Sequence, residues 1–405
     1  MKVRLWIPLC AALALATVWP GDRAHGATVS GRASTVLEWF DHPGGDTAVP
    51  LYQYLLLNAR DLTGNGLNFQ GYGRLSRDLN DRVDADSRLY YAYLEQKRLL
   101  ANLDARLGRQ FIGTTAGASL MDGLLLKYRT GGRLGFSLFG GGDVKYHDSY
   151  DADDLIVGTE VTGKYLADDL TVGLSYVHKR DDGDVSAELF GLDVDYQYQE
   201  SLNLYSETQF NWLTDGITYF LGGATYHAAP RWTLRGEYLY SLPVFSATSI
   251  FSVFAVAEYE EVLAELSYKL GPGLNSFLRT TYEIYPEFDN ARVVEAGVEK
   301  IRTDRLSGYL AGVLRLDDEG QDLKGIKARL ACQVTKMWQA GVGAHLDHLE
   351  RRLEDNSDTT TSSRLWTDVT GDLTKKTSIQ AKLERVESDL WDEYYRGQLR
   401  LNIRF

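Results

Sequence analysis

The chain is poor in several residues and patterns on which other protein classes depend. Only one of its two cysteines, Cys332, lies outside the first 26 residues, so no internal disulfide is expected. After those first residues, no run approaches the roughly 20 apolar residues that a membrane-spanning helix requires. Basic residues are also outnumbered, with 43 Lys and Arg against 56 Asp and Glu and a net charge of −13. This balance argues against nucleic acid, whose binding depends on basic side chains that neutralise phosphates.

Aromatic residues, in contrast, are abundant. The chain has 25 Tyr, 8 Trp and 14 Phe but only 3 Met and 8 Pro, and its mean hydropathy is slightly negative at −0.27. A transmembrane β-barrel has such a composition, because its residues alternate between lipid and water and aromatic girdles mark both interfaces. A large secreted β-sandwich or solenoid is the alternative.

The first 26 residues have the features of a secretory signal. Lys2 and Arg4 precede an apolar run, and small residues around Ala24 and Gly26 precede Ala27. We therefore expect residues 1–26 to be a cleaved signal peptide and residues 27–405 to form a single domain. Cys10 raises a lipoprotein alternative, but the leucine before it stands where that signal requires a small residue.

A two-residue periodicity runs through the rest of the chain and is clearest in the last twelve residues, 394–405. Alternate side chains of this segment suit lipid, whereas the others, which include Arg396, Arg400 and Arg404, suit water. Similar segments recur, separated by connections that are alternately short and long, for example 130–132 and 143–154. This pattern predicts an all-β fold, a transmembrane antiparallel up-and-down β-barrel of about 22 strands, with 18 to 24 as the accepted range. The spacing leaves no residues for a plug.

An aromatic last residue, Phe405, at the end of such a strand resembles the closing strand of Gram-negative outer-membrane β-barrels. The resemblance implies that the terminal aromatic belongs to the signal for barrel insertion and that the protein lies in the outer membrane. Residues 107–110 (Leu-Gly-Arg-Gln), followed by Asp122-Gly123, also resemble a short pattern of alginate-export-type and related porins. Strand-end glycines of any barrel are the alternative explanation.

Charged side chains within the strands are expected to face the lumen, because a charge on the lipid face near the midplane costs about 2–4 kcal/mol. Cys332 is expected to face lipid as an ordinary small residue. Arginines paired with neighbouring carboxylates would merely hold the wall in shape, whereas unpaired ones would attract anions; calcium between Asp193 and Asp195 is a weaker hypothesis. The predicted lumen-lining residues are Arg396, Arg400, Arg404, Lys327, Arg329, Glu261, Glu265, Asp193, Asp195, Arg235 and Glu237.

One outer connection, 243–254, is unusually apolar. It either extends two strands, folds into the lumen as a constriction, or forms a docking patch for a partner. We expect it to narrow the bore together with the connection 114–122. Its apolar residues are Val244, Phe245, Ile250, Phe251, Val253 and Phe254.

No catalytic motif stands out, and neither an enzyme nor a cofactor is expected. His345 and His348 fall on opposite faces of a strand, which argues against a zinc pair. Two functions fit: a porin-like channel for passive diffusion of small hydrophilic solutes through a charged, water-filled lumen, or a sheath for a separate multihaem c-type cytochrome in an electron conduit. A homo-oligomer is implied only by the resemblance to porins.

Overall fold

Strands make up most of the residues that the computed structural model describes, which are 27–41, 45–145, 154–242, 258–286, 289–318, 321–353, 356–389 and 391–405. The strands are β1 (Thr28–Asp41), β2 (Thr47–Ala48), β3 (Pro50–Arg60), β4 (Leu67–Asp78), β5 (Arg88–Leu100), β6 (Leu103–Thr114), β7 (Gly117–Arg129), β8 (Leu134–Asp143), β9 (Leu155–Tyr165), β10 (Leu170–Asp181), β11 (Asp184–Tyr198), β12 (Leu202–Asn211), β13 (Gly216–Ala229), β14 (Trp232–Ser241), β15 (Tyr259–Gly271), β16 (Leu274–Ile284), β17 (Ala291–Lys300), β18 (Leu306–Asp317), β19 (Leu323–Gln333), β20 (Trp338–Leu353), β21 (Asn356–Asp372), β22 (Thr377–Ser388) and β23 (Trp391–Arg404).

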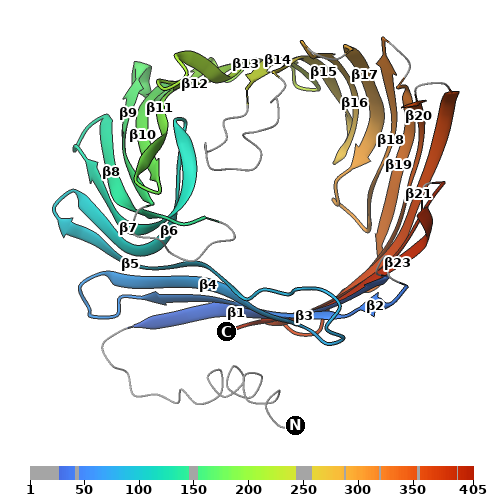
Figure 1. The fold of residues 1–405 in the computed structure, drawn as a ribbon, viewed down its shortest axis with the longest axis horizontal. Coiled ribbons are helices and arrows are strands. Elements are labelled where there is room, and N and C mark those ends of the chain that lie inside the picture. The colour runs from blue at the N-terminus through green and yellow to red at the C-terminus, as the bar shows by residue number, and fades with distance from the viewer. Residues whose placement is uncertain are drawn as a thin grey trace, which may run out of the picture.

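These strands close into a barrel, because β1 pairs antiparallel with both β3 and β23 (Figure 1). The two-residue strand β2 pairs only with one end of β1, so the wall itself has 22 strands, which confirms the predicted number. Closure matters in lipid because it leaves no strand edge without hydrogen-bond partners. Among the described residues, no helix is long and apolar enough to span a membrane.

The two faces of the wall differ in chemistry as the alternation predicted. On the outer face, large apolar side chains are exposed; Leu330 is 56% exposed and Val342 is 58% exposed. On the opposite face, charged side chains of different strands pair with one another, for example Arg329 on β19 with Asp368 on β21 at 2.9 Å. The outer face is therefore suited to hydrocarbon and the inner face to water.

The alternation of the sequence predicts strands at 67–78 and 155–165, and these ranges coincide with β4 and β9. It also predicts outer connections at 114–122, 181–186 and 351–361, which are much shorter in the structure. Residues 114–122 belong mostly to β6 and β7, residues 181–186 mostly to β10 and β11, and much of 351–361 belongs to β20 and β21. The small residues near 114–120 resemble a loop in sequence, but they serve a hairpin that packs against other backbone.

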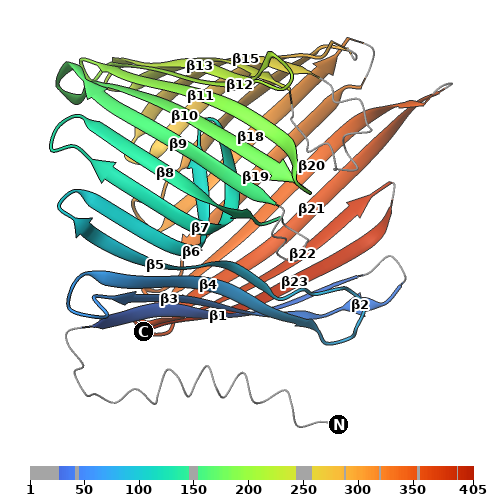
Figure 2. The same ribbon diagram turned by 60° about the vertical axis from the view of Figure 1, so that its left-hand side comes forward.

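The β6–β7 hairpin leaves the wall and bends into the barrel (Figures 1 and 2). Along the described strands, β5 pairs with β6 from Ala92 to Leu100, whereas β6 and β7 remain paired up to Thr114 and Gly117. The outer half of the hairpin therefore does not pair with β5 and lies instead against the inner surface of β9 to β12. We call residues 110–121 the inward hairpin.

Candidate functional site

The tip of the inward hairpin is fastened to the middle of the barrel wall. The Ala116 amide donates to Ser175 Oγ at 2.9 Å, and Thr115 Oγ1 donates to Asp193 Oδ1 at 2.8 Å. Gln209 Nε2 donates to the Ala116 carbonyl oxygen at 2.9 Å. These contacts reach β10, β11 and β12, so the tip crosses several strands and lies within the lumen.

A missing side chain at Gly191 makes this contact geometrically feasible. A Cβ atom at Gly191 would lie 2.2 Å from the Ala116 nitrogen and 2.5 Å from Ser175 Oγ. Only glycine lets the backbone of the tip approach the wall so closely.

Three further glycines lie at the base of the inward hairpin, at the point where the hairpin bends. Gly108, Gly123 and Gly141 are directly paired across β6, β7 and β8. Gly108 has a φ of 125°, a region that favours glycine, and a Cβ at Gly123 would lie 2.2 Å from the Gly140 carbonyl oxygen. The row of glycines thus forms a crease. It includes Gly108 and Gly123 of the short porin-like pattern, and it gives both residues a structural role.

An apolar cluster fills the space between the inward hairpin and the wall. Met121 is fully buried, Ile156 and Val177 are each 1% exposed, and Phe139 is 2% exposed. The other members are Ile112, Ala116, Leu125, Ala187 and Leu189. Because these side chains are on the inner face, the cluster is a small core inside the barrel. It stabilises the bent position of the hairpin.

Polar contacts reinforce one side of the inward hairpin. Lys179 Nζ donates to Ser119 Oγ at 2.9 Å and lies 3.2 Å from Asp143 Oδ2. Ser119 also bonds the Asp143 carboxylate. At the crease, Arg109 and Asp122 form a two-bond ion pair at 2.7 and 2.8 Å that joins the two strands of the hairpin.

The predicted lumen-lining residues share the inner face. Cross-strand pairs connect Asp193 to Glu207, Arg235 to Glu265 and Glu384 to Arg396 on that face. All eleven predicted side chains (Arg396, Arg400, Arg404, Lys327, Arg329, Glu261, Glu265, Asp193, Asp195, Arg235 and Glu237) occupy positions of this face by register. Their part in solute passage stays a prediction.

The inner face is basic on one side of the barrel. A hollow of about 430 Å³ lies against β19 to β23 and is lined by Arg329, His345, Arg364, Trp366, Asp368, Thr370, Gln380, Ala381, Lys382 and Gln398. Beside it, the Glu384 carboxylate is only 4% exposed and is shared by Arg364 at 2.9 Å, Lys382 at 2.6 Å and Arg396 at 3.9 Å. Cations therefore outnumber carboxylates on this part of the wall.

The inner face is acidic on the next sector of the wall, β11 to β17, which only β18 separates from the basic strands. The carboxylates there are Asp193, Asp195, Glu207, Glu237, Glu261, Glu265, Glu283, Glu295 and Glu299, and the facing bases on the same strands are Arg235, Lys269 and Arg279. In Figure 1, β12 to β17 run along the top and upper right of the barrel, and β19 to β23 continue down its right-hand side. Sequence alternation found the charged residues, but only the closed wall shows that the two signs gather on separate, adjacent sectors.

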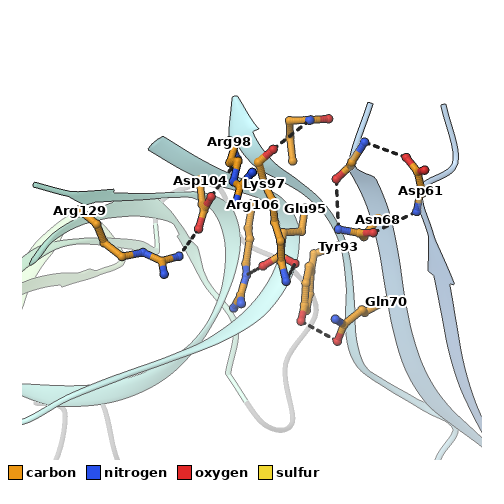
Figure 3. Close-up of polar contacts among 12 residues, drawn as sticks. Asp61, Asn68, Gln70, Tyr93, Glu95, Lys97, Arg98, Asp104, Arg106 and Arg129 are labelled. Atoms are coloured by element: carbon orange, nitrogen blue, oxygen red, sulfur yellow. Dashed lines mark hydrogen bonds and ion pairs between the residues drawn. The ribbon is translucent and has the colours of Figure 1, made fainter. Parts of the chain in front are cut away.

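Polar networks also connect the strands beside the hairpin base (Figure 3). Arg106 Nε donates to Glu95 Oε1 at 2.7 Å, and Tyr93 Oη donates to Gln70 Oε1 at 2.9 Å. The Asp104 carboxylate accepts from the Arg98 amide at 2.9 Å and also bonds Arg129. Fixed contacts of this kind hold the wall in shape on both sides of the crease.

One acidic cluster, at the outer ends of β9 and β10, lies within reach of a basic side chain. Asp154, Asp181 and Asp182 have carboxylate oxygens within 4.8 Å of one another. The Lys145 ammonium bonds the Asp181 carboxylate and lies 3.1 Å from Asp154, and these hydrogen bonds raise the pKa of Lys145 above its ordinary value. Two of the three carboxylates therefore share an ammonium group of the chain itself. The predicted apolar connection with Val244, Phe245, Ile250, Phe251 and Phe254 lies outside the described residues.

Comparison with solved structures adds the fold class. A mutant of the ferric enterobactin receptor PfeA from Pseudomonas aeruginosa matches with a TM-score of 0.64 and 11% identity, over 94% of this chain and 81% of that chain. The translocation pore of the P pilus usher PapC matches with a TM-score of 0.52 and 7% identity, over 93% and 99%. The chain has the closed β-barrel fold of these two proteins. Pseudomonas aeruginosa OpdQ also matches the barrel, with a TM-score of 0.49 and 9% identity over 94% and 99%. No protein-family model and no curated protein matches the barrel in sequence.

Proposed function

We propose that the barrel is a porin-like channel through which small hydrophilic solutes diffuse passively across the outer membrane. The observation that carries this proposal is the inward hairpin. A wall of 22 strands encloses a wide interior. A hairpin fastened to its middle at Ser175, Asp193 and Gln209 narrows that interior from one side.

The charge distribution supports the same function. Carboxylates gather on β11 to β17 and bases on β19 to β23, and charged side chains that line a bore tune the selectivity of a pore. The separation of the two signs around the wall also creates a field within the bore, which orients a dipolar solute as it passes.

The inward hairpin favours a channel over a sheath around a multihaem cytochrome, because a protein partner would need space that the hairpin occupies. The barrel could still form a homo-oligomer, as the resemblance to porins implies.

Reconstitution tests the proposal directly. The folded, purified barrel is inserted into planar bilayers, and liposomes that contain it are tested for swelling in solutes of increasing size. We expect stable, small conductance steps and a sharp size limit. A folded barrel that conducts nothing, or one that gives a very large unselective leak and co-purifies with haem, would contradict the channel and support the sheath.

A further inference from the structure

Six tyrosines form a continuous row on the inner face of β3, β4 and β5, which we call the tyrosine ladder. Its members are Tyr52, Tyr54, Tyr72, Tyr90, Tyr91 and Tyr93. Ring centroids of adjacent members lie between 4.8 and 6.3 Å apart. The rings are half-buried rather than enclosed, so their remaining surface is open to the lumen.

A β-bulge adds one ring to this row. The pairing of β4 with β5 shifts between Tyr72 and Gly73, so that Tyr72 pairs with Tyr91 and Gly73 pairs with Leu89. Tyr90 is the extra residue, and its ring stacks on Tyr72 with centroids 4.8 Å apart and an interplanar angle of 20°. In a regular strand, Tyr90 and Tyr91 would face opposite sides. Bulges re-aim side chains in this way next to functional sites.

The ladder runs from the outer mouth of the barrel to the crease. Tyr52 lies two residues from the outer end of β3, whereas Tyr93 pairs directly with Gly108. The residues of β5 from Arg88 to Tyr91 lie beyond the last pair with β6 at Ala92 and Arg109. The bend of the inward hairpin therefore begins beside the inner end of the ladder.

Hydrogen-bonding groups alternate with the rings along this row. Gln70 accepts from the Tyr93 hydroxyl at 2.9 Å (Figure 3). Arg74 lies 5.1 Å from the Tyr52 ring centre, and Arg106 lies 5.2 Å from that of Tyr93. Arg106 donates to the Glu95 carboxylate, whereas Arg74 donates to the neutral carbonyl oxygen of Asp86 and keeps its positive charge. The ladder thus offers flat apolar faces, hydrogen-bonding groups and one positive charge beside Tyr52.

We propose that the tyrosine ladder is a binding track for linear oligosaccharides, which it guides from the outer mouth to the inward hairpin. Sugar rings present an apolar face that stacks on an aromatic ring, and their hydroxyl groups bond the side chains between the rings. Several adjacent, equivalent rings allow a chain of sugars to advance by one ring at a time, so that binding at each position stays weak enough for release. This inference rests on the proposed channel function and specifies a class of solute.

Current block in planar bilayers tests the track. Maltohexaose is added to the wild-type barrel, and its half-blocking concentration is compared with those of Tyr72→Ala and Tyr91→Ala. We expect each alanine variant to raise this concentration about tenfold, whereas Tyr72→Phe, which keeps the ring, changes it by less than about threefold. Tyr309→Ala is the matched control, because Tyr309 is an inner-face tyrosine on β18 whose hydroxyl contacts His345 at 3.3 Å. An unchanged single-channel conductance without sugar shows that each variant is folded.

The outcomes separate this inference from the proposed function. A barrel that conducts ions but is not blocked by maltohexaose, or is blocked equally in all variants, overturns the track and leaves the channel standing. A folded barrel without any conductance defeats the channel itself. Block by N-acetyltryptophanamide without block by maltohexaose overturns the class of solute, and equal block by polyethylene glycol of the same length would show that size alone is sensed.

Discussion

Replacing Gly191 by valine should release the inward hairpin from the wall. A Cβ atom at this position would lie 2.2 Å from the Ala116 nitrogen and 2.5 Å from Ser175 Oγ, distances at which something must move. The neighbouring atoms are backbone and a short side chain, which cannot swing away as a long side chain would. The tip of the inward hairpin is the part that can move, because the hairpin bends at the glycine crease at its base.

The magnitude follows from the contacts that the tip would lose. The Ala116 amide would lose Ser175, and Gln209 would lose the Ala116 carbonyl oxygen. At about 0.5–1.5 kcal/mol for each hydrogen bond, the loss is about 1–3 kcal/mol. This shifts the balance between docked and undocked hairpin by one to two orders of magnitude.

Single-channel recording measures the consequence. We expect Gly191→Val to give a larger mean conductance, more frequent transitions between levels and a higher solute size limit in liposome swelling. Gly236→Val is the matched control, because the nearest atom to a Cβ there is 3.9 Å away. If folded Gly191→Val has the conductance and size limit of the wild type, the inward hairpin does not narrow the bore and the reasoning is refuted.

Two further predictions concern charge. Glu384→Gln should shift the reversal potential in a salt gradient towards anions and lower the free energy of unfolding by about 2–3 kcal/mol. The reason is that Arg364, Lys382 and Arg396 lose the carboxylate that they share. An unchanged reversal potential would show that the basic strands β19 to β23 do not set the ion selectivity. In the turn between β17 and β18, the Leu306 amide and then Lys300 hold the pKa of Asp304 below its ordinary value of 3.8. The stabilisation by Asp304 should therefore be complete above that value and disappear as the pH falls through the lower pKa of the folded state. Urea unfolding should show Asp304→Asn to be less stable than the wild type at pH 7 and equal to it in strong acid, and a difference that persists in acid would contradict the linkage.

The sequence by itself determined the wall of the barrel. Strand identity depends on local alternation, and a one-residue slip would turn every side chain to the wrong face, so the lipid and water faces can be read from one strand at a time. Arg329 is an example, because its apolar neighbours Ala328 and Leu330 face lipid. No contact with another strand is needed to predict that Arg329 faces the lumen. The same local rule gave the strand number.

The tertiary structure decided what happens inside the wall. Residues 114–122 have the small side chains of a loop, and their sequence does not reveal that Gly191, about 75 positions away, leaves room for Ala116. The glycine row at Gly108, Gly123 and Gly141 becomes a crease only when three strands are in register, and the tyrosine ladder depends on a bulge that shifts Tyr90. These features arise from contacts between distant segments, whereas periodicity reports only how each segment meets lipid and water.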